Sequence, residues 1–363
     1  MKTFFSIIVP CCDVAPYIRE CLESVINQTF EDWECLVVVE TSNDNTEQIV
    51  HEITERDKRF KVFTQPRSGS PSAPRNTGLD HACGEYVIFL DGDDSIADGS
   101  LARLAELITA RPGADLYPCA ILAYTGTTNN SHVIDNYPVD KNPPSELSGH
   151  DAILFLDKLF CFPEPITQAT VYLKSFLAAN NLRFIEQLKH EDWEFTPRAL
   201  YRAKRIVPLH ELYYLYRCNR DGSIMFLTRK NGDFLKHFAL VYKSLFAFHA
   251  VASREIGFDS HISACWARAW ISKILICWFS IFYVKQFSRS YRHDTLKILF
   301  SNGFDDFDAL VKATTIPRRI AAWFVRLFVQ HPSWAWVSEQ FFMKIYFPLT
   351  DMKNKKSKHK SDT

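Results

Sequence analysis

Residues 84–94 read GEYVIFLDGDD, an apolar run that stops at a group of carboxylates. A short, wholly apolar run bounded by turn residues is typical of a strand that is buried on both faces, as in a parallel sheet. Asp91, Asp93 and Asp94 repel one another within this single turn, because like charges at short range are unfavourable. We therefore expect a buried strand over 85–90 whose carboxyl end carries a dense negative charge.

Strand-like and helix-like segments alternate around this run. Similar strands are expected at 4–9 (FFSIIV), 34–39 (ECLVVV), 60–64 and 115–122. Amphipathic helices are expected at 45–57, 73–82 and 98–110, and after Asp13, which can cap the first helix. The alternation predicts an α/β fold with a mostly parallel sheet flanked by helices on both faces. Because ligands bind off the carboxyl ends of the strands in such a sheet, we expect one cleft there.

The pattern changes beyond residue 123. Residues 124–147 are polar and rich in proline, and we expect a loop there. A helix at 149–159 and two short strands near 205–217 are expected to follow. From residue 229 the pattern is helical and aromatic. We predict three parts: an α/β domain over 1–225, an α-helical, aromatic-rich C-terminal region over 226–352 and a basic tail over 353–363.

The composition limits the class of protein. The chain has 42 Lys+Arg and 42 Asp+Glu in 363 residues, which argues against a protein that binds nucleic acid through its overall charge. Its ten cysteines form no CxxC pair and no zinc-like cluster, and so indicate buried thiols in a reducing cytoplasm. The N-terminus has no signal-peptide pattern, and the longest apolar stretch, 274–284, is shorter than the roughly 20 residues that span a bilayer. We therefore expect a cytoplasmic protein.

A basic, aromatic segment near the C-terminal end has two interpretations. Arg318, Arg319 and Arg326 lie at helical spacing with Trp323 and Phe324. Such a segment suits a membrane surface, which would make the protein peripheral at the inner face of the cell membrane. It equally suits a helical packing subdomain whose arginines extend their charged ends into water.

Three carboxylates beside a ligand cleft are typical of a site for a divalent cation. Carboxylate oxygens suit Mg²⁺ or Mn²⁺, which keeps several of its waters and also binds substrate phosphates. The predicted ligands are Asp91 and Asp93. An exposed turn or a helix cap would have the same sequence, and this alternative stays open.

Three further segments carry candidate site residues. Glu40 follows the strand at 34–39, where it can accept hydrogen bonds from a nucleobase or a ribose, or lie in a plain polar loop. Arg75 can stabilise negative charge beside the cation, or pair with a carboxylate at a helix end. Glu191 and Asp192 can supply a general base, or simply favour the start of a helix.

Taken in order, these segments resemble the family-2 glycosyltransferases, which have the GT-A fold, over roughly residues 4–225. Each match is weak by itself, but the ordered set is specific. The matching stretches are SIIVPCCDVAPYIRECLESVINQTF, ECLVVVETSNDNT, SAPRNTGL, GEYVIFLDGDD, LRFIEQLKHEDWEF and YLYRCNRDGSIM.

The resemblance implies roles for individual residues. Asp91 and Asp93 match the DxD metal motif, and Asp192 matches the catalytic base of a Glu-Asp motif. Glu40 matches the carboxylate that reads the nucleotide base. The other implied substrate-binding residues are Pro10, Cys12, Asp13, Arg75, Glu191, Arg217 and Arg220.

Two positions depart from the family pattern. Cys12-Asp13 stands where family members usually have an aromatic residue followed by Asn. Val39-Glu40 stands where they usually have two aspartates, so that the acidic side chain is one methylene longer.

The sequence therefore predicts an inverting, metal-dependent glycosyltransferase. It would move a sugar from a nucleotide sugar, most simply a UDP-sugar, to a hydroxyl of a glycan or lipid-linked acceptor in bacterial surface-polysaccharide or lipopolysaccharide synthesis. Two alternatives stay open: a nucleotidyltransferase, which would not need Asp192, and a degenerate, non-catalytic nucleotide-sugar-binding protein. The sequence has no GxGxxG after the first strand and no P-loop motif, which argues against dinucleotide redox and P-loop enzymes.

Overall fold

The computed structural model describes residues 3–159, 166–220, 223, 234–256, 261–262 and 265–266. The chain divides into two compact units, Met1–His237 with Ser244–Gly257, and Phe238–Lys243 with Phe258–Thr363. All the residues discussed for the site lie in the first unit. The predicted boundary near 226, most of the region 226–352, its basic segment and the tail 353–363 lie outside the described residues, so the three-part division stays a prediction.

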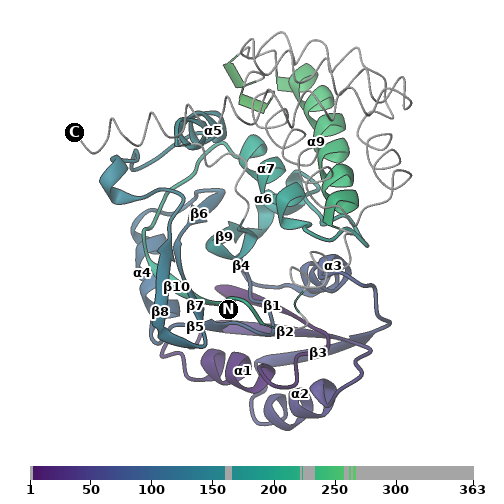
Figure 1. Ribbon diagram of the computed structural model, residues 1–363. Coiled ribbons are helices and arrows are strands. Elements are labelled where there is room, and N and C mark those ends of the chain that lie inside the picture. Colours follow the sequence, from purple (N-terminus) through teal and green to yellow (C-terminus); the bar gives the residue numbers. More distant parts are fainter. Residues whose placement is uncertain are drawn as a thin grey trace, which may run out of the picture. The chain divides into compact units, whose positions relative to one another are not determined.

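The first unit is built on a six-stranded sheet with the order β3-β2-β1-β4-β9-β6 (Figure 1). The strands are β1 (Phe5–Cys11), β2 (Trp33–Glu40), β3 (Phe60–Gln65), β4 (Tyr86–Phe89), β6 (Leu116–Pro118) and β9 (Thr170–Leu173). Strand β1 pairs in parallel with β2 and β4, and β2 pairs in parallel with β3. Only β9 runs against its neighbours β4 and β6. The predicted α/β class with a mostly parallel sheet is confirmed.

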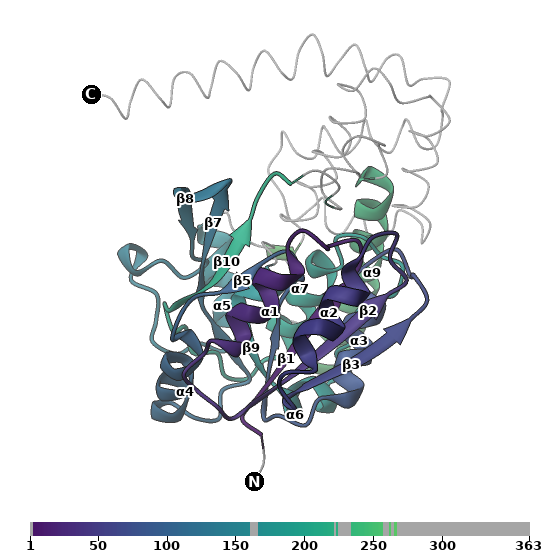
Figure 2. The ribbon, with the colours of Figure 1, turned by 90° about the horizontal axis from the view of Figure 1, so that it is seen from below.

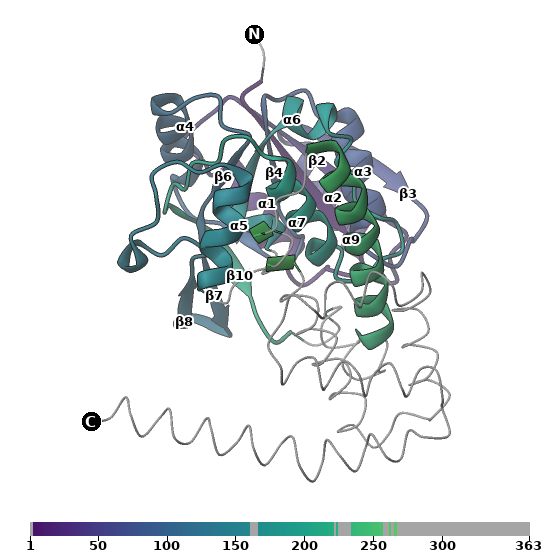
Figure 3. The same ribbon diagram turned by 90° about the horizontal axis from the view of Figure 1, so that it is seen from above.

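Helices cover both faces of this sheet. Helices α1 and α2 lie on one face, seen from below in Figure 2, and α3 and α7 lie on the other, seen from above in Figure 3. The helices are α1 (Ile18–Ile26), α2 (Thr46–Thr54), α3 (Ser72–His81), α4 (Ser100–Ala110), α5 (Gly149–Lys158), α6 (Lys174–Ala179), α7 (Asp192–Arg202) and α9 (Phe234–Ile256), with 3-10 turns η1 (Val139–Lys141) and η2 (Thr167–Ala169). None of these helices is long and apolar enough to cross a membrane.

The two covered faces explain why the central strands are apolar at nearly every position. Successive side chains of a strand point to opposite faces, so a strand with helices on both sides needs apolar residues throughout. Val9 and Val37 belong to the core cluster that contains the buried face of α1. On the other face, α3 approaches β1 so closely that a Cβ on Gly78 would lie 2.3 Å from Ile8 Cγ2.

A second, four-stranded sheet corrects three predictions. Its order is β5-β10-β7-β8, with β5 (Ser95–Ile96), β7 (Ala120–Thr125), β8 (Thr127–Ile134) and β10 (Leu212–Arg217). The predicted loop at 124–147 is wrong in part, because β8 lies within it. This strand is an exposed edge that is polar over its first six positions, and its pairing with β7 holds it in place. The predicted strand 115–122 is two strands, β6 and β7, in different sheets. Of the two strands predicted near 205–217, β10 forms, whereas at the other place Ile206 makes only isolated bridges with Leu116 and Leu147.

Candidate active site

The acidic turn lies directly after β4, against the carboxyl end of β1. Asp91, Asp93 and Asp94 each place a carboxylate oxygen within 4.8 Å of the others. Gly92 suits the crowded position between them, because a Cβ there would make a tight contact of 3.1 Å with the Pro10 carbonyl oxygen. The backbone N–H of Asp94 donates to the Asp91 carbonyl at 3.0 Å and closes the turn.

Asp94 is the buried member of this acidic turn, with 2% of its surface exposed. Its two oxygens accept hydrogen bonds at 2.7 Å from Tyr214 Oη and from the backbone N–H of Arg217. Burial, and then the charges of Asp93 and Asp91, raise the pKa of Asp94 well above its ordinary value. Asp94 therefore joins the acidic turn to β10.

Asp93 is the carboxylate next to two arginines at the end of β10: Arg217, the last residue of the strand, and Arg220, three residues later. It forms an ion pair with Arg220, and its carbonyl oxygen accepts from Arg217 Nε at 3.1 Å. Burial raises the pKa of Asp93; the Asp91 charge adds to this shift and Arg220 opposes it. Three mutually repelling carboxylates of this kind fit a divalent cation, whose charge would relieve the repulsion.

Arg217 and Arg220 flank the ring of Tyr17 at the start of α1. Their guanidinium carbons lie 5.1 and 5.4 Å from the ring centre, within cation–π range. Arg217 Nη2 also pairs with Glu20 at 2.8 Å. The structure thus brings both predicted arginines to the edge of the acidic turn.

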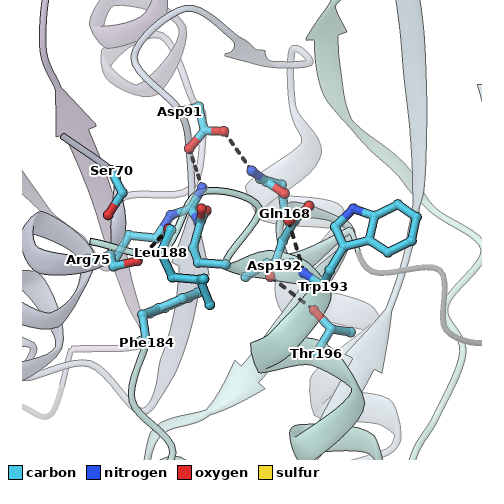
Figure 4. A network of polar contacts seen from close by, with 12 residues as sticks. Ser70, Arg75, Asp91, Gln168, Phe184, Leu188, Asp192, Trp193 and Thr196 are labelled. Atoms are coloured by element: carbon cyan, nitrogen blue, oxygen red, sulfur yellow. Dashed lines mark hydrogen bonds and ion pairs between the residues drawn. The ribbon is translucent and has the colours of Figure 1, made fainter. Parts of the chain in front are cut away.

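A buried guanidinium joins the acidic turn to the start of α7. Arg75, on α3, is 1% exposed. Its Nη2 lies 2.6 Å from Asp91 Oδ1, and its Nη1 lies 2.5 Å from Glu191 Oε1 (Figure 4). The other oxygen of Asp91 accepts from Gln168 Nε2 at 2.6 Å. Both interpretations of Arg75 meet here, since it pairs with a carboxylate at a helix end and lies beside the candidate cation site.

Asp192 is the first residue of α7. Its Oδ1 accepts from the backbone N–H of Trp193 at 3.0 Å. Burial, and then the charge of Glu191, raise the pKa of Asp192 well above the usual aspartate value, against the opposing effect of Arg75. A raised pKa in a carboxylate near a cleft is typical of an acid–base residue.

Glu40 lies at the end of β2 and is 3% exposed. Its Oε1 accepts hydrogen bonds from Gln65 Nε2 at 3.2 Å, from the backbone N–H of Ser68 at 3.0 Å and from Ser68 Oγ at 2.5 Å. Glu40 therefore orders the loop between β3 and α3, in addition to any contact with a nucleotide.

Cys12 and Asp13 face the same loop from the end of β1. Asp13 has a left-handed backbone (φ 51°), accepts from the Asn43 backbone N–H at 2.6 Å and pairs with Arg67 at 2.7 Å. The predicted capping role of Asp13 is wrong, because α1 begins only at Ile18 and Asp13 instead ties two loops together. Although burial opposes it, the contacts with Asn43 and Arg67 lower the pKa of Asp13.

Sequence reasoning missed several residues of this site. Gln168, Tyr214, Arg67 and Tyr17 all contact predicted residues. Tyr17 and Tyr214 lie within stretches that match the family, but neither was singled out, and Gln168 and Arg67 lie outside those stretches. Gln168 and Tyr214 are 77 and 120 residues from the aspartates that they contact. No local pattern could have indicated Gln168, and only the matching stretch that begins at Tyr214 could have indicated the tyrosine.

Comparison with known proteins decides the family. The family profile described as glycosyl transferase family 2 matches residues 6–164. The GalNAc(5)-diNAcBac-PP-undecaprenol beta-1,3-glucosyltransferase of Campylobacter jejuni is 30% identical over 230 residues, which are 62% of this chain and 68% of that protein. The chain belongs to glycosyltransferase family 2. The enzyme is also 28% identical to the uncharacterized glycosyltransferase EpsJ of Bacillus subtilis over 254 residues, 69% of this chain and 70% of EpsJ.

A solved structure shares the fold of this glycosyltransferase. Residues 1–349 of Staphylococcus aureus TarS, in complex with UDP-GlcNAc, superpose with a TM-score of 0.65 and 23% identity over 90% of this chain and 88% of that one. In sequence, the match with TarS, a poly(ribitol-phosphate) beta-N-acetylglucosaminyltransferase, is 30% identical over 224 residues and covers 61% of this chain but only 36% of TarS. The predicted GT-A fold of the glycosyltransferase is confirmed.

Proposed function

We propose that this glycosyltransferase is inverting and metal-dependent, and that it moves a sugar from a UDP-sugar to a hydroxyl of a glycan or lipid-linked acceptor. The observation that carries the proposal is the chain of ion pairs Asp91–Arg75–Glu191. This chain joins the acidic turn to the helix that begins at Asp192, so that a cation site and a base belong to one site.

Asp91 and Asp93 would hold a Mn²⁺ or Mg²⁺ ion, and the buried Asp94 would orient the turn. A bound ion of this kind neutralises charge on a diphosphate leaving group. Arg217 and Arg220 lie beside the same turn, where they can bind the donor diphosphate. Pro10, Cys12, Asp13 and Glu40 line the neighbouring strand ends and would contact the nucleoside.

Asp192 would act as the general base. Its carboxylate would take the proton from the acceptor hydroxyl, whose oxygen then attacks the anomeric carbon from the face opposite the diphosphate. A single displacement of this kind inverts the configuration at that carbon. Glu191 would hold the start of α7 through Arg75.

The relatives support the choice of substrates. One TarS structure holds UDP-GlcNAc, and the name of the Campylobacter jejuni relative specifies an acceptor linked to PP-undecaprenol. We propose by analogy a UDP-hexose donor and a role in cell-surface polymer synthesis, with the acceptor met at the cytoplasmic face of the membrane.

A panel of nucleotide sugars tests the proposal. The full-length chain with Mn²⁺ is expected to release UDP from one of them, faster with a polyprenyl-diphosphate-linked glycan present, and NMR of the product should show an inverted anomeric carbon. Release of pyrophosphate from a nucleoside triphosphate would instead indicate a nucleotidyltransferase. Binding of nucleotide sugars without any turnover would indicate a non-catalytic binding protein.

Arg220→Ala is expected to change the affinities for two ligands in opposite directions. The Arg220 guanidinium now neutralises Asp93 and so competes with a cation. Its removal should tighten Mn²⁺ binding to the donor-free protein by about fivefold, the equivalent of roughly 1 kcal/mol. The KM for the donor should rise, because one partner of the diphosphate is lost.

Calorimetric titration with Mn²⁺ and donor kinetics check both expectations. Arg205→Ala is the matched control, because Arg205 pairs with Glu146 at 2.9 Å, away from the acidic turn. Weaker Mn²⁺ binding by Arg220→Ala than by the control would contradict competition at Asp93.

A further inference from the structure

Asp91 is held from two sides by internal donors. Arg75 Nη2 lies 2.6 Å from one carboxylate oxygen and Gln168 Nε2 lies 2.6 Å from the other, and Figure 4 shows the two side chains reaching Asp91 from different directions. Two charge-assisted hydrogen bonds from rigid neighbours leave a carboxylate little freedom to rotate.

Gln168 is itself fixed to the surrounding structure. Its backbone carbonyl oxygen accepts a hydrogen bond from Tyr213 Oη on β10. The preceding residue, Thr167, is buried and shares a hydrogen bond of 3.0 Å with Thr196 on α7. The turn η2 that carries Gln168 is thus attached both to the small sheet and to the helix that begins at Asp192.

Arg75 is too deeply buried in this arrangement to contact the nucleotide-sugar donor directly. The guanidinium lies over the rings of Phe184 and Phe89, with its carbon 5.2 and 5.9 Å from their centres. Although burial alone would lower its pKa, the charges of Asp91 and Glu191 raise it, so Arg75 stays protonated. Both of its Nη atoms are used to bridge these two carboxylates.

We propose that Arg75 and Gln168 are positioning residues: together they fix the orientation of the Asp91 carboxylate, and Arg75 also fixes the start of α7 that carries Asp192. The inference rests on the proposed function, because it assigns these residues to the cation site and the base of that reaction. It gives Arg75 an indirect role, through two carboxylates, in place of contact with the substrate.

Arg75→Lys separates positioning from charge. Lysine keeps the positive charge but has a single ammonium group, which cannot reproduce the planar fork between two carboxylates. Since small misplacements of reacting groups can lower a rate about 10²-fold, we expect a loss of that order in kcat. The KM for the donor should stay within about threefold of wild type if Arg75 makes no donor contact.

Gln168→Ala removes the second hydrogen-bond donor to the Asp91 carboxylate. Partners of metal ligands typically contribute about tenfold to hundredfold in metal affinity or activity. We expect the Kd for Mn²⁺ to rise by about tenfold, measured by calorimetry on the full-length chain in the absence of nucleotide sugar. This measurement does not depend on catalytic turnover.

Two matched controls report the effect of lost stability alone. Arg198→Lys alters another ion pair of an arginine, in which the partly buried Arg198 lies 2.6 Å from the buried Glu194, elsewhere on α7. Gln28→Ala removes a buried glutamine that donates to the carbonyl oxygens of Ser24 and Ala97 at 3.0 Å. Both controls should lower the melting temperature while kcat and the Kd for Mn²⁺ stay near wild type.

The possible outcomes are distinct. A raised donor KM with unchanged kcat in Arg75→Lys would overturn the inference in favour of direct donor contact, and a kcat loss no larger than that of Arg198→Lys would reduce Arg75 to a stability role. If Arg75→Lys does not fold, unchanged Mn²⁺ affinity in folded Gln168→Ala overturns the inference by itself. A wild-type chain that neither binds Mn²⁺ nor transfers any sugar would overturn the proposed function and this inference with it.

Discussion

Asp192→Asn is expected to lower the transfer rate by a factor of about 10²–10⁴, the usual contribution of a general base. Asparagine keeps the shape of the side chain, and its oxygen can still accept from the Trp193 backbone N–H. It cannot take a proton from the acceptor. Donor affinity should survive, because the acidic turn and its arginines are unchanged.

Two quantities are measured for each variant: the rate of sugar transfer and the affinity for the nucleotide sugar. Asp151→Asn serves as the control, since Asp151 also lies in the first turn of a helix, where its carboxylate completes the capping box of α5. This control should transfer sugar at the wild-type rate. If Asp192→Asn keeps more than about a tenth of the rate, the base must lie elsewhere in the site.

The raised pKa of Asp192 leads to two further expectations, one for the pH dependence of the rate and one for the stability of the variant. A base works only when unprotonated, so the wild-type rate should fall as the pH is lowered through a pKa that lies above the usual aspartate value. The same shift means that the folded state favours the neutral carboxyl group, whose stabilising effect is lost as the pH rises through the folded pKa. The permanently neutral asparagine is therefore expected to leave the melting temperature at neutral pH unchanged or higher.

Asp93→Asn is expected to reduce transfer by more than about 100-fold while the fold is kept. A neutral amide is a poor ligand for Mg²⁺ or Mn²⁺, and loss of a ligand should exceed the effect of losing a partner of a ligand. The variant should bind Mn²⁺ weakly in calorimetry, and excess Mn²⁺ should restore only part of the rate.

Asp98→Asn is the control for this variant, because Asp98 is an exposed carboxylate five positions further along the same segment. It should behave as wild type. Full activity of the wild-type enzyme in the presence of EDTA would contradict the metal assignment, whatever the effect of Asp93→Asn.

The central strands of the sheet could be predicted because their apolar pattern can be read from the sequence of each strand by itself. Strands β1 and β2 are apolar at nearly every position, since helices cover both of their faces, and each ends at a change from apolar to polar residues. Strand β8 could not be predicted in this way. It is an exposed edge whose side chains are polar throughout its first six positions, and only its pairing with β7 makes it a strand.

The residues of the candidate site likewise fall into those that the sequence indicates and those that only the structure reveals. Asp91, Asp93 and Asp192 are indicated by motifs that the sequence contains, and the structure places Asp91 one buried arginine away from the residue before Asp192. Whether each has its predicted role stays a prediction. Gln168 could not be found from the sequence, because its importance depends on a contact across 77 residues that only the tertiary structure creates.

The contact of the acidic turn with β10 has a consequence for the order in which the chain becomes competent during its synthesis. Tyr214 Oη accepts from the Asp91 backbone N–H across 123 residues and donates to Asp94. At roughly 5–20 residues per second, a ribosome needs about 6–25 s to add that length of chain. Throughout this interval the nascent turn has its carboxylates but not the tyrosine. Arg75, made earlier, is already available to Asp91, whereas Phe184 and Glu191, which lie against Arg75 in the complete fold, are added only later. A ribosome-bound nascent chain therefore passes through a stage in which its first four strands are complete and its candidate active site is not yet closed by β10.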